Sequence, residues 1–188
     1  MKSQDIVILL KLASLEELKA DQAEWLRWVP IGEDPFSVRN LAASLGISKS
    51  EVSASINRSL SSGLALKDRE FNRPKPSRRN LLKFIVGGLK YVFPAKPGAI
   101  QRGIPTGFDA PMLKGRLMSA GERIHVWPYA KASESGQSVE PLFPSVPQAV
   151  LSDLRLHEYL ALVDAIRLGN QREAGLAEEL LSERLMKR

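Results

Sequence analysis

The sequence predicts a mainly α-helical protein interrupted by an irregular, proline-rich segment. Apolar residues recur at intervals of three, four and seven within residues 1–93 and again within 151–188, and this spacing places them along one face of a helix. Eight of the twelve prolines fall between residues 94 and 147, where they interrupt regular helices. We therefore expect three parts: a helical domain over 1–93, an extended segment over 94–150 and C-terminal helices over 151–188.

The first two expected helices span about Ser3–Ala13 and Leu15–Val29. Ser14 and Glu17 stand three residues apart at the start of the second helix, a spacing typical of a capping box. Residues 30–35 begin and end with proline and predict a loop.

Residues 37–64 predict two helices joined by a tight turn. The first, near 37–45, carries an apolar stripe, and Gly46 ends it where a left-handed conformation costs least. Ser48 and Glu51 have the spacing of a capping box, so the second helix has its own start signal. Two helices with such a corner are typical of the helix-turn-helix that reads DNA.

The second of these helices has a polar side that suits base recognition. Val52, Ile56 and Leu60 form its expected inward stripe. Short polar and basic side chains on the other side can pair with base edges in a major groove, and alanine can lie against a thymine methyl group. The predicted base-reading residues are Lys49, Ser50, Ser53, Ala54, Asn57 and Arg58.

The stretch resembles the winged helix-turn-helix regulators of bacteria, most nearly the MarR-like group. The resemblance rests on residues 41–48 (LAASLGIS), on Val52-Ser53 and on residues 60–64, and it covers the N-terminal part of the chain alone. It implies a recognition helix at about 48–62, a basic β-wing after it, and a homodimer that acts on transcription by binding double-stranded DNA.

Positive charge is concentrated directly after the expected recognition helix. The formal net charge is +6, and residues 67–102 contain ten Lys and Arg but two Asp and Glu. Such a concentration favours contact with a phosphate backbone, although a solvated basic face would look the same. Pro74 and Pro76 lack the amide hydrogen that a strand needs, so we expect a short or irregular wing. The predicted phosphate-binding residues are Ser48, Lys67, Arg69, Arg73, Lys75, Arg78, Arg79 and Lys83.

A further helix is expected from Ser77 to about Val92. Arg78 and Arg79 in its first turn oppose the helix dipole, a conflict that a bound anion would resolve. Alternatively, these long side chains extend into water. The pair Gly87-Gly88 weakens the helix, and we expect another element to pack closely against it.

The remaining chain predicts one short strand and two helices. The strand is expected at about residues 123–127 and an exposed flexible tip at 132–138. The helices, at about Asp153–Gly169 and Gln171–Arg188, carry leucine stripes that either form a dimer seam or pack within their own domain.

The same sequence argues against several classes of function. It has no cysteine and two histidines, so we expect no disulfide, metal or other cofactor, and no motif indicates an enzyme. The apolar run at residues 6–10 is too short for a membrane span, and a reducing cytoplasm is the natural compartment. We expect a sequence-specific DNA-binding regulator. The alternative is a protein-interaction module, such as an antitoxin or adaptor whose segment 94–150 wraps a partner protein.

Overall fold

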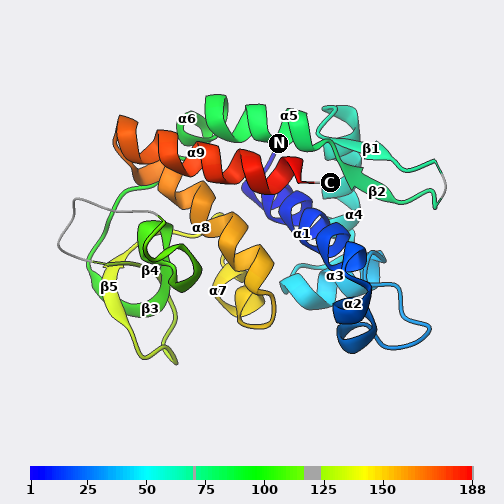
Figure 1. The fold of residues 1–188 in the computed structure, drawn as a ribbon, viewed down its shortest axis with the longest axis horizontal. Helices are drawn as coiled ribbons and strands as arrows, with labels where there is room; N and C mark the ends of the chain where they lie inside the picture. Colours follow the sequence, from blue (N-terminus) through cyan, green and yellow to red (C-terminus); the bar gives the residue numbers. More distant parts are fainter. Residues whose placement is uncertain (70, 117–123, 188) are drawn as a thin grey trace. The chain divides into compact units, whose positions relative to one another are not determined.

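The computed structural model describes residues 1–69, 71–116 and 124–187, and it is mainly helical with a small amount of sheet (Figure 1). The chain divides into two compact units, residues 1–81 and 82–188. The expected division into three parts differs from this, because the segment 94–150 shares a unit with the C-terminal helices. None of the described helices combines the length and the apolar character that crossing a bilayer requires.

The first unit is built on one long helix, α1 (Ser3–Ala20), whose residues 4–10 are buried without a break. The expected helix start at Ser14 is wrong, since Ser14 lies buried inside α1. The break comes at Asp21, whose carboxylate accepts a hydrogen bond from the backbone N–H of Glu24 and so begins α2 (Gln22–Trp28).

Two shorter helices, α3 (Val38–Leu45) and α4 (Lys49–Ser61), follow as the sequence predicts. Ser37 and Ser48 cap them, and Gly46 joins them at a φ of 63°, in the left-handed region. A residue with a Cβ is disfavoured there, which explains the glycine.

A short antiparallel hairpin comes next, formed by β1 (Ala65–Lys67) and β2 (Pro74–Pro76). Leu66 pairs with Lys75 between the two prolines, so each missing amide hydrogen lies at an end of the strand. The strand is short because the prolines bound it. In the turn, the backbone N–H of Asp68 donates to the carbonyl oxygen of Arg73 at 2.8 Å.

The helix expected at 77–92 forms, with an irregular centre. It comprises α5 (Arg78–Phe84), a π-helical turn η1 (Ile85–Leu89) and α6 (Lys90–Val92). The expected close packing against the glycine pair is wrong: a Cβ at Gly87 would meet no described atom within 4 Å, and one at Gly88 would meet only the Phe84 ring. The wide turn accounts for the pair, since glycine adapts most easily to an irregular backbone.

The proline-rich segment is more regular than expected. It forms three strands, β3 (Ile100–Thr106), β4 (His125–Pro128) and β5 (Ser135–Ser138), which close into a small barrel. β3 runs antiparallel to both others, and β4 and β5 are parallel. A Cβ at Gly103 would lie 2.1 Å from the carbonyl oxygen of Trp127, so this closure requires glycine.

The expectations for this segment hold only in part. The strand expected at 123–127 corresponds to β4, and its first residue, Arg123, lies outside the described residues. The expected flexible tip at 132–138 is wrong over its second half, because residues 135–138 form β5. Short turns η2 (Gly107–Asp109) and η3 (Pro111–Leu113) connect β3 to the residues that follow.

The C-terminal helices match the expected positions. After α7 (Val146–Ala149) and η4 (Val150–Ser152) come α8 (Leu154–Leu168) and α9 (Gln171–Met186), capped by the side chains of Asp153 and Asn170. Residues 159–166 of α8 are all buried, and Leu181 and Leu185 of α9 are buried as well. Because these apolar side chains are used inside the unit, packing within the domain describes them better than a dimer seam.

A buried carboxylate organises the second unit. One oxygen of Asp164 on α8 accepts hydrogen bonds from Thr106 Oγ1 on β3 at 2.9 Å and from Trp127 Nε1 on β4 at 2.6 Å. Its other oxygen pairs with Arg167 at 2.6 Å, and Arg167 also donates to the carbonyl oxygen of Phe93. Burial raises the pKa of Asp164, while Arg167 and the two other donors oppose that rise.

Replacing this carboxylate should destabilise the second unit. Asp164→Ala leaves Thr106 Oγ1 and Trp127 Nε1 without this acceptor and the buried Arg167 without its carboxylate, so we expect the free energy of unfolding to fall by roughly 3–5 kcal/mol. Asp164→Asn keeps an oxygen acceptor and should cost less. Denaturant unfolding followed by circular dichroism measures both, with the exposed Glu178→Ala as a control expected to change stability by less than about 0.5 kcal/mol. An alanine variant as stable as the control would contradict this role.

Candidate nucleic-acid interface

Helix α4 is packed on one side by the rest of the first unit. Val52, Ser55 and Ser59 are buried, and α4 contacts both α1 and α3. The expected inward stripe is therefore rotated: Val52 is buried as predicted, but Ile56 and Leu60 are only half-buried. The small serine side chains lie where apolar ones were expected, and small side chains let two helices approach closely.

The opposite side of α4 is exposed and polar. Four of the six predicted base-reading residues are exposed, namely Lys49, Ser50, Ser53 and Asn57, and a fifth, Ala54, is half-buried. Ser61 is also exposed on this side, one turn after Asn57, and sequence reasoning did not include it. These side chains therefore face solvent, as the predicted outward face requires.

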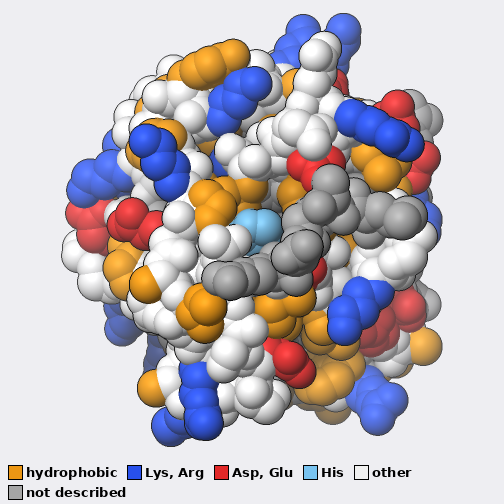
Figure 2. Space-filling model, turned by 90° about the vertical axis from the view of Figure 1, so that its left-hand side faces the viewer, with side chains coloured by type: hydrophobic (Ala, Val, Ile, Leu, Met, Phe, Trp, Pro, Cys, Tyr) orange, Lys and Arg blue, Asp and Glu red, His pale blue; other side chains and the backbone are white. Residues whose placement is uncertain are grey.

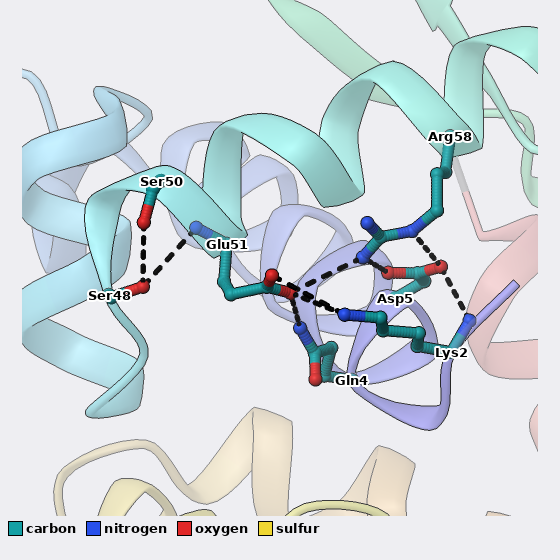
Figure 3. A network of polar contacts seen from close by, with 7 residues as sticks. All are labelled: Lys2, Gln4, Asp5, Ser48, Ser50, Glu51 and Arg58. Carbon is teal, nitrogen blue, oxygen red and sulfur yellow. Dashed lines mark hydrogen bonds and ion pairs between the residues drawn. The ribbon is translucent and has the colours of Figure 1, made fainter.

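Arg58 does not share that outward position. Its Nε donates to Asp5 Oδ2 at 3.0 Å and its terminal nitrogen to Asp5 Oδ1 at 2.7 Å (Figure 3). The Asp5 side chain is fully buried, so this two-bond contact holds the guanidinium against α1. Arg58 thus supports α4, and the expectation that it reads bases does not agree with this geometry.

Glu51 also turns toward α1 and away from its own cap. Ser48 Oγ accepts a hydrogen bond from the Glu51 backbone N–H at 3.3 Å, which is half of the expected capping box. The other half does not form, because the Glu51 carboxylate accepts hydrogen bonds from Lys2 Nζ and Gln4 Nε2 (Figure 3). The hydrogen bond from Lys2 lowers the pKa of Glu51.

The same contacts fix the charge state of Asp5. Burial pushes the pKa of Asp5 upward, but hydrogen bonds from Arg58 and from the Lys2 backbone N–H outweigh it and hold that pKa below its ordinary value. In return, Asp5 raises the pKa of Arg58. Two charged links, Asp5–Arg58 and Lys2–Glu51, thus join the first turns of α1 to α4.

Three predicted phosphate-binding cations are already paired with carboxylates. Arg73 lies 3.6 Å from Asp34, while Lys75 and Arg78 both contact Glu16, at 3.7 and 2.9 Å. These contacts tie the hairpin and the start of α5 to α1 and to the loop before α3. They give the three cations a structural role within the first unit.

Glu16 supplies the negative charge that the start of α5 was expected to need. Arg78 was expected to need an anion because its positive charge opposes the helix dipole. The anion is the Glu16 carboxylate, which accepts hydrogen bonds from both Nε and a terminal nitrogen of Arg78. The expected phosphate clamp at Arg78 is therefore occupied from within the chain.

Other cations of the predicted set remain available. Lys67 and Arg69 on the hairpin, and Arg79 and Lys83 on α5, are exposed and form no ion pair with any residue that the structure describes. Ser48 is exposed as well, with its hydroxyl 3.1 Å from that of Ser50. Sequence reasoning missed Arg39, an exposed cation on α3, because it lies outside the basic run.

The two histidines have separate partners. His157 Nε2 donates to the carbonyl oxygen of Pro105, and burial lowers the pKa of His157. His125 instead contacts Asp109, with 3.2 Å between Nδ1 and Oδ2. Within residues 1–69, 71–116 and 124–187, no three His, Cys, Asp or Glu residues are grouped to hold a metal ion.

The face in Figure 2 shows a histidine among hydrophobic side chains, with Lys and Arg spread among acidic ones.

Comparisons with protein-family models, with curated proteins and with solved structures find no match to this chain.

The ion pair between α1 and α4 should make stability depend on pH. In the folded protein the pKa of Asp5 lies below its ordinary value of 3.8, so the pair stabilises fully above about pH 5 and loses its contribution as pH falls through the folded pKa. We expect Asp5→Asn to lower the free energy of unfolding by roughly 2–4 kcal/mol at pH 7 and by progressively less as the pH falls below 3.8.

Urea unfolding at pH 7, 5 and 3, followed by circular dichroism, measures this difference. The exposed Glu179→Gln is the matched control and should show no such loss. A deficit of Asp5→Asn that stays constant over the three pH values would refute the ionised pair.

Proposed function

We propose that the first unit is a winged helix-turn-helix and that the protein is a sequence-specific transcriptional regulator that binds double-stranded DNA as a homodimer. One observation carries the proposal: the exposed side of α4 is polar and uncovered, while the pair of Arg58 with the buried Asp5 and the exposed pair of Glu51 with Lys2 hold the helix against α1. An exposed helix of 13 residues is about 20 Å long, enough to lie along a major groove.

The side chains on that face have the chemistry for base recognition. The Asn57 amide can both donate to and accept from adenine, and Lys49 can donate to guanine. Ser50 and Ser53 can hydrogen-bond either kind of base edge, and the Ala54 methyl group suits a thymine methyl. We assign base reading to these five residues and leave Arg58 out.

A smaller set of cations would hold the phosphates than the sequence suggested. Lys67 and Arg69 extend from the hairpin beyond α4, and Arg79 and Lys83 follow on α5. Arg39 adds a cation on α3. Because Arg73, Lys75 and Arg78 are paired with carboxylates, we assign them to positioning the hairpin.

The alternative of a partner-wrapping module has less support. This alternative requires residues 94–150 to wrap another protein. Instead, β3 and the turn η2 pack against α8 of the same unit. The segment therefore contributes to its own core. We favour DNA binding because no described residue packs over the exposed side chains of α4.

Asn57→Ala should relax the choice of sequence. The preferred duplex is first selected from a random library with the wild-type protein, and binding is then measured by fluorescence anisotropy on that duplex and on a scrambled one. We expect a loss of about 1–3 kcal/mol on the selected duplex and little change on the scrambled one. Selection that returns no preferred sequence would refute the proposal.

Arg69→Ala should weaken binding to all duplexes alike. Loss of one phosphate contact is expected to reduce the slope of log K against log salt by about 0.9 for each protomer. Arg172→Ala removes an exposed cation from the second unit and is the matched control. An unchanged slope for Arg69→Ala, or an equal change for Arg172→Ala, would show that the hairpin does not contact phosphate.

A further inference from the structure

The short helix α2 and the turn after it expose unusually large apolar side chains. None of the residues 22–28 of α2 is buried. The Trp28 side chain is 62% exposed, and Ile31 at the tip of the turn is fully exposed. Gly32, at a φ of 84°, and the hydrogen bond from Glu33 N–H to the Pro30 carbonyl oxygen hold that turn in place.

Aromatic rings and cations connect this segment to the hairpin. Trp25 stacks on Phe36 with 6.3 Å between ring centroids, and the Arg73 guanidinium lies 5.1 Å from the Phe36 ring and 5.0 Å from the Phe71 ring. Lys19 Nζ lies 4.3 Å from the same Phe71 ring. Trp28 follows Trp25 by one helical turn, so it continues the side of α2 that carries this stack.

A helix of seven residues has little stability of its own in water. It normally gains stability by burying an apolar face, but no residue of α2 is fully buried and Trp25 is only half-buried. Exposed aromatic residues beside an arginine are the composition that binding interfaces concentrate. We name this area the α2 surface, defined by Trp28, Ile31, Phe71 and Arg73.

Charges around the α2 surface have both signs. Arg27 and Glu33 are exposed and form no ion pair with any described residue, and Asp34 offsets Arg73. Such a balance does not suit a phosphate backbone or an anionic membrane, both of which favour an excess of cations. It does suit a second copy, because a two-fold axis can bring a cation of one chain against an anion of the other.

We propose that the α2 surface is where two copies of this chain associate, with Trp28 and Ile31 at the centre and Arg27 facing Glu33 of the other copy at the rim. The idea that such a dimer reads paired DNA half-sites rests on the proposed function. The dimer itself does not depend on that function, and its formation can be measured in the absence of DNA.

The size of the α2 surface indicates how tightly two copies should bind each other. A few large side chains on each copy form a small patch, at the low end of the sizes of specific interfaces. We therefore expect a reversible dimer with a Kd of about 1–100 µM.

Sedimentation velocity over a range of protein concentrations tests the proposal. We expect Trp28→Glu and Ile31→Glu each to raise the dimer Kd at least tenfold, by placing a carboxylate in the apolar centre. Both positions are exposed, so the variants should keep the wild-type circular dichroism spectrum.

Two leucines serve as matched controls. Leu26 lies on another side of α2 and is 78% exposed, and Leu154 in the second unit is 72% exposed. Leu26→Glu and Leu154→Glu should change the Kd by less than about twofold. A chain that stays monomeric at high concentration, or a dimer that the control variants disrupt as strongly, would overturn the proposal.

Charge reversal tests the two-fold arrangement. Arg27→Glu and Glu33→Arg should each raise the Kd several-fold, and the double variant should restore it because the complementary pairs are kept. A double variant that dimerises no better than the single ones would refute the pairing. Loss of DNA binding with dimerisation intact would count against the proposed function alone.

Discussion

The first unit depends on one buried carboxylate, Asp5, which comes almost at the start of the chain. It binds Arg58 near the end of α4 through two hydrogen bonds, and Lys2 and Gln4 beside it bind Glu51 near the start of the same helix. A helix held at both ends cannot rotate about its axis. The contacts with α1 therefore decide which side chains of α4 are exposed, as much as the apolar stripe of α4 does.

The basic run after α4 illustrates how a local charge count can overstate a binding surface. Three of the seven predicted phosphate-binding cations are neutralised by carboxylates that are distant in sequence, such as Glu16, which is 62 residues from Arg78. Paired cations of this kind still matter, because they hold the hairpin in a fixed position. Phosphate attraction would then arise from the fewer cations at its exposed end.

Features set by neighbouring residues were readable from the sequence. Ser37, Gly46 and Ser48 act within one helical turn, so the bounds of α3 and α4 could be predicted, and the positions of α8 and α9 followed from their apolar stripes. Ser14 had the right local spacing but lies on the buried side of a longer helix, where the hydrophobic core prevails over a capping preference. Of the candidate interface, the exposed polar side of α4 was predictable, whereas the inward turn of Arg58 depends on a partner 53 residues away. The barrel was missed because its three strands pair across long gaps.

The hydrogen bonds to the buried Asp164 carboxylate affect the order in which the second unit can fold during synthesis. Thr106 and Trp127 leave the ribosome 58 and 37 residues before the carboxylate that accepts their hydrogen bonds. Until α8 has emerged, β3 and β4 lack that acceptor and the helix on which they pack, so contacts this distant in sequence form late. The N-terminal unit, whose residues are complete by position 81, can assemble while the remainder is still being translated. The nascent strands therefore pass through an interval in which a chaperone that shields unpaired edges would be of most use.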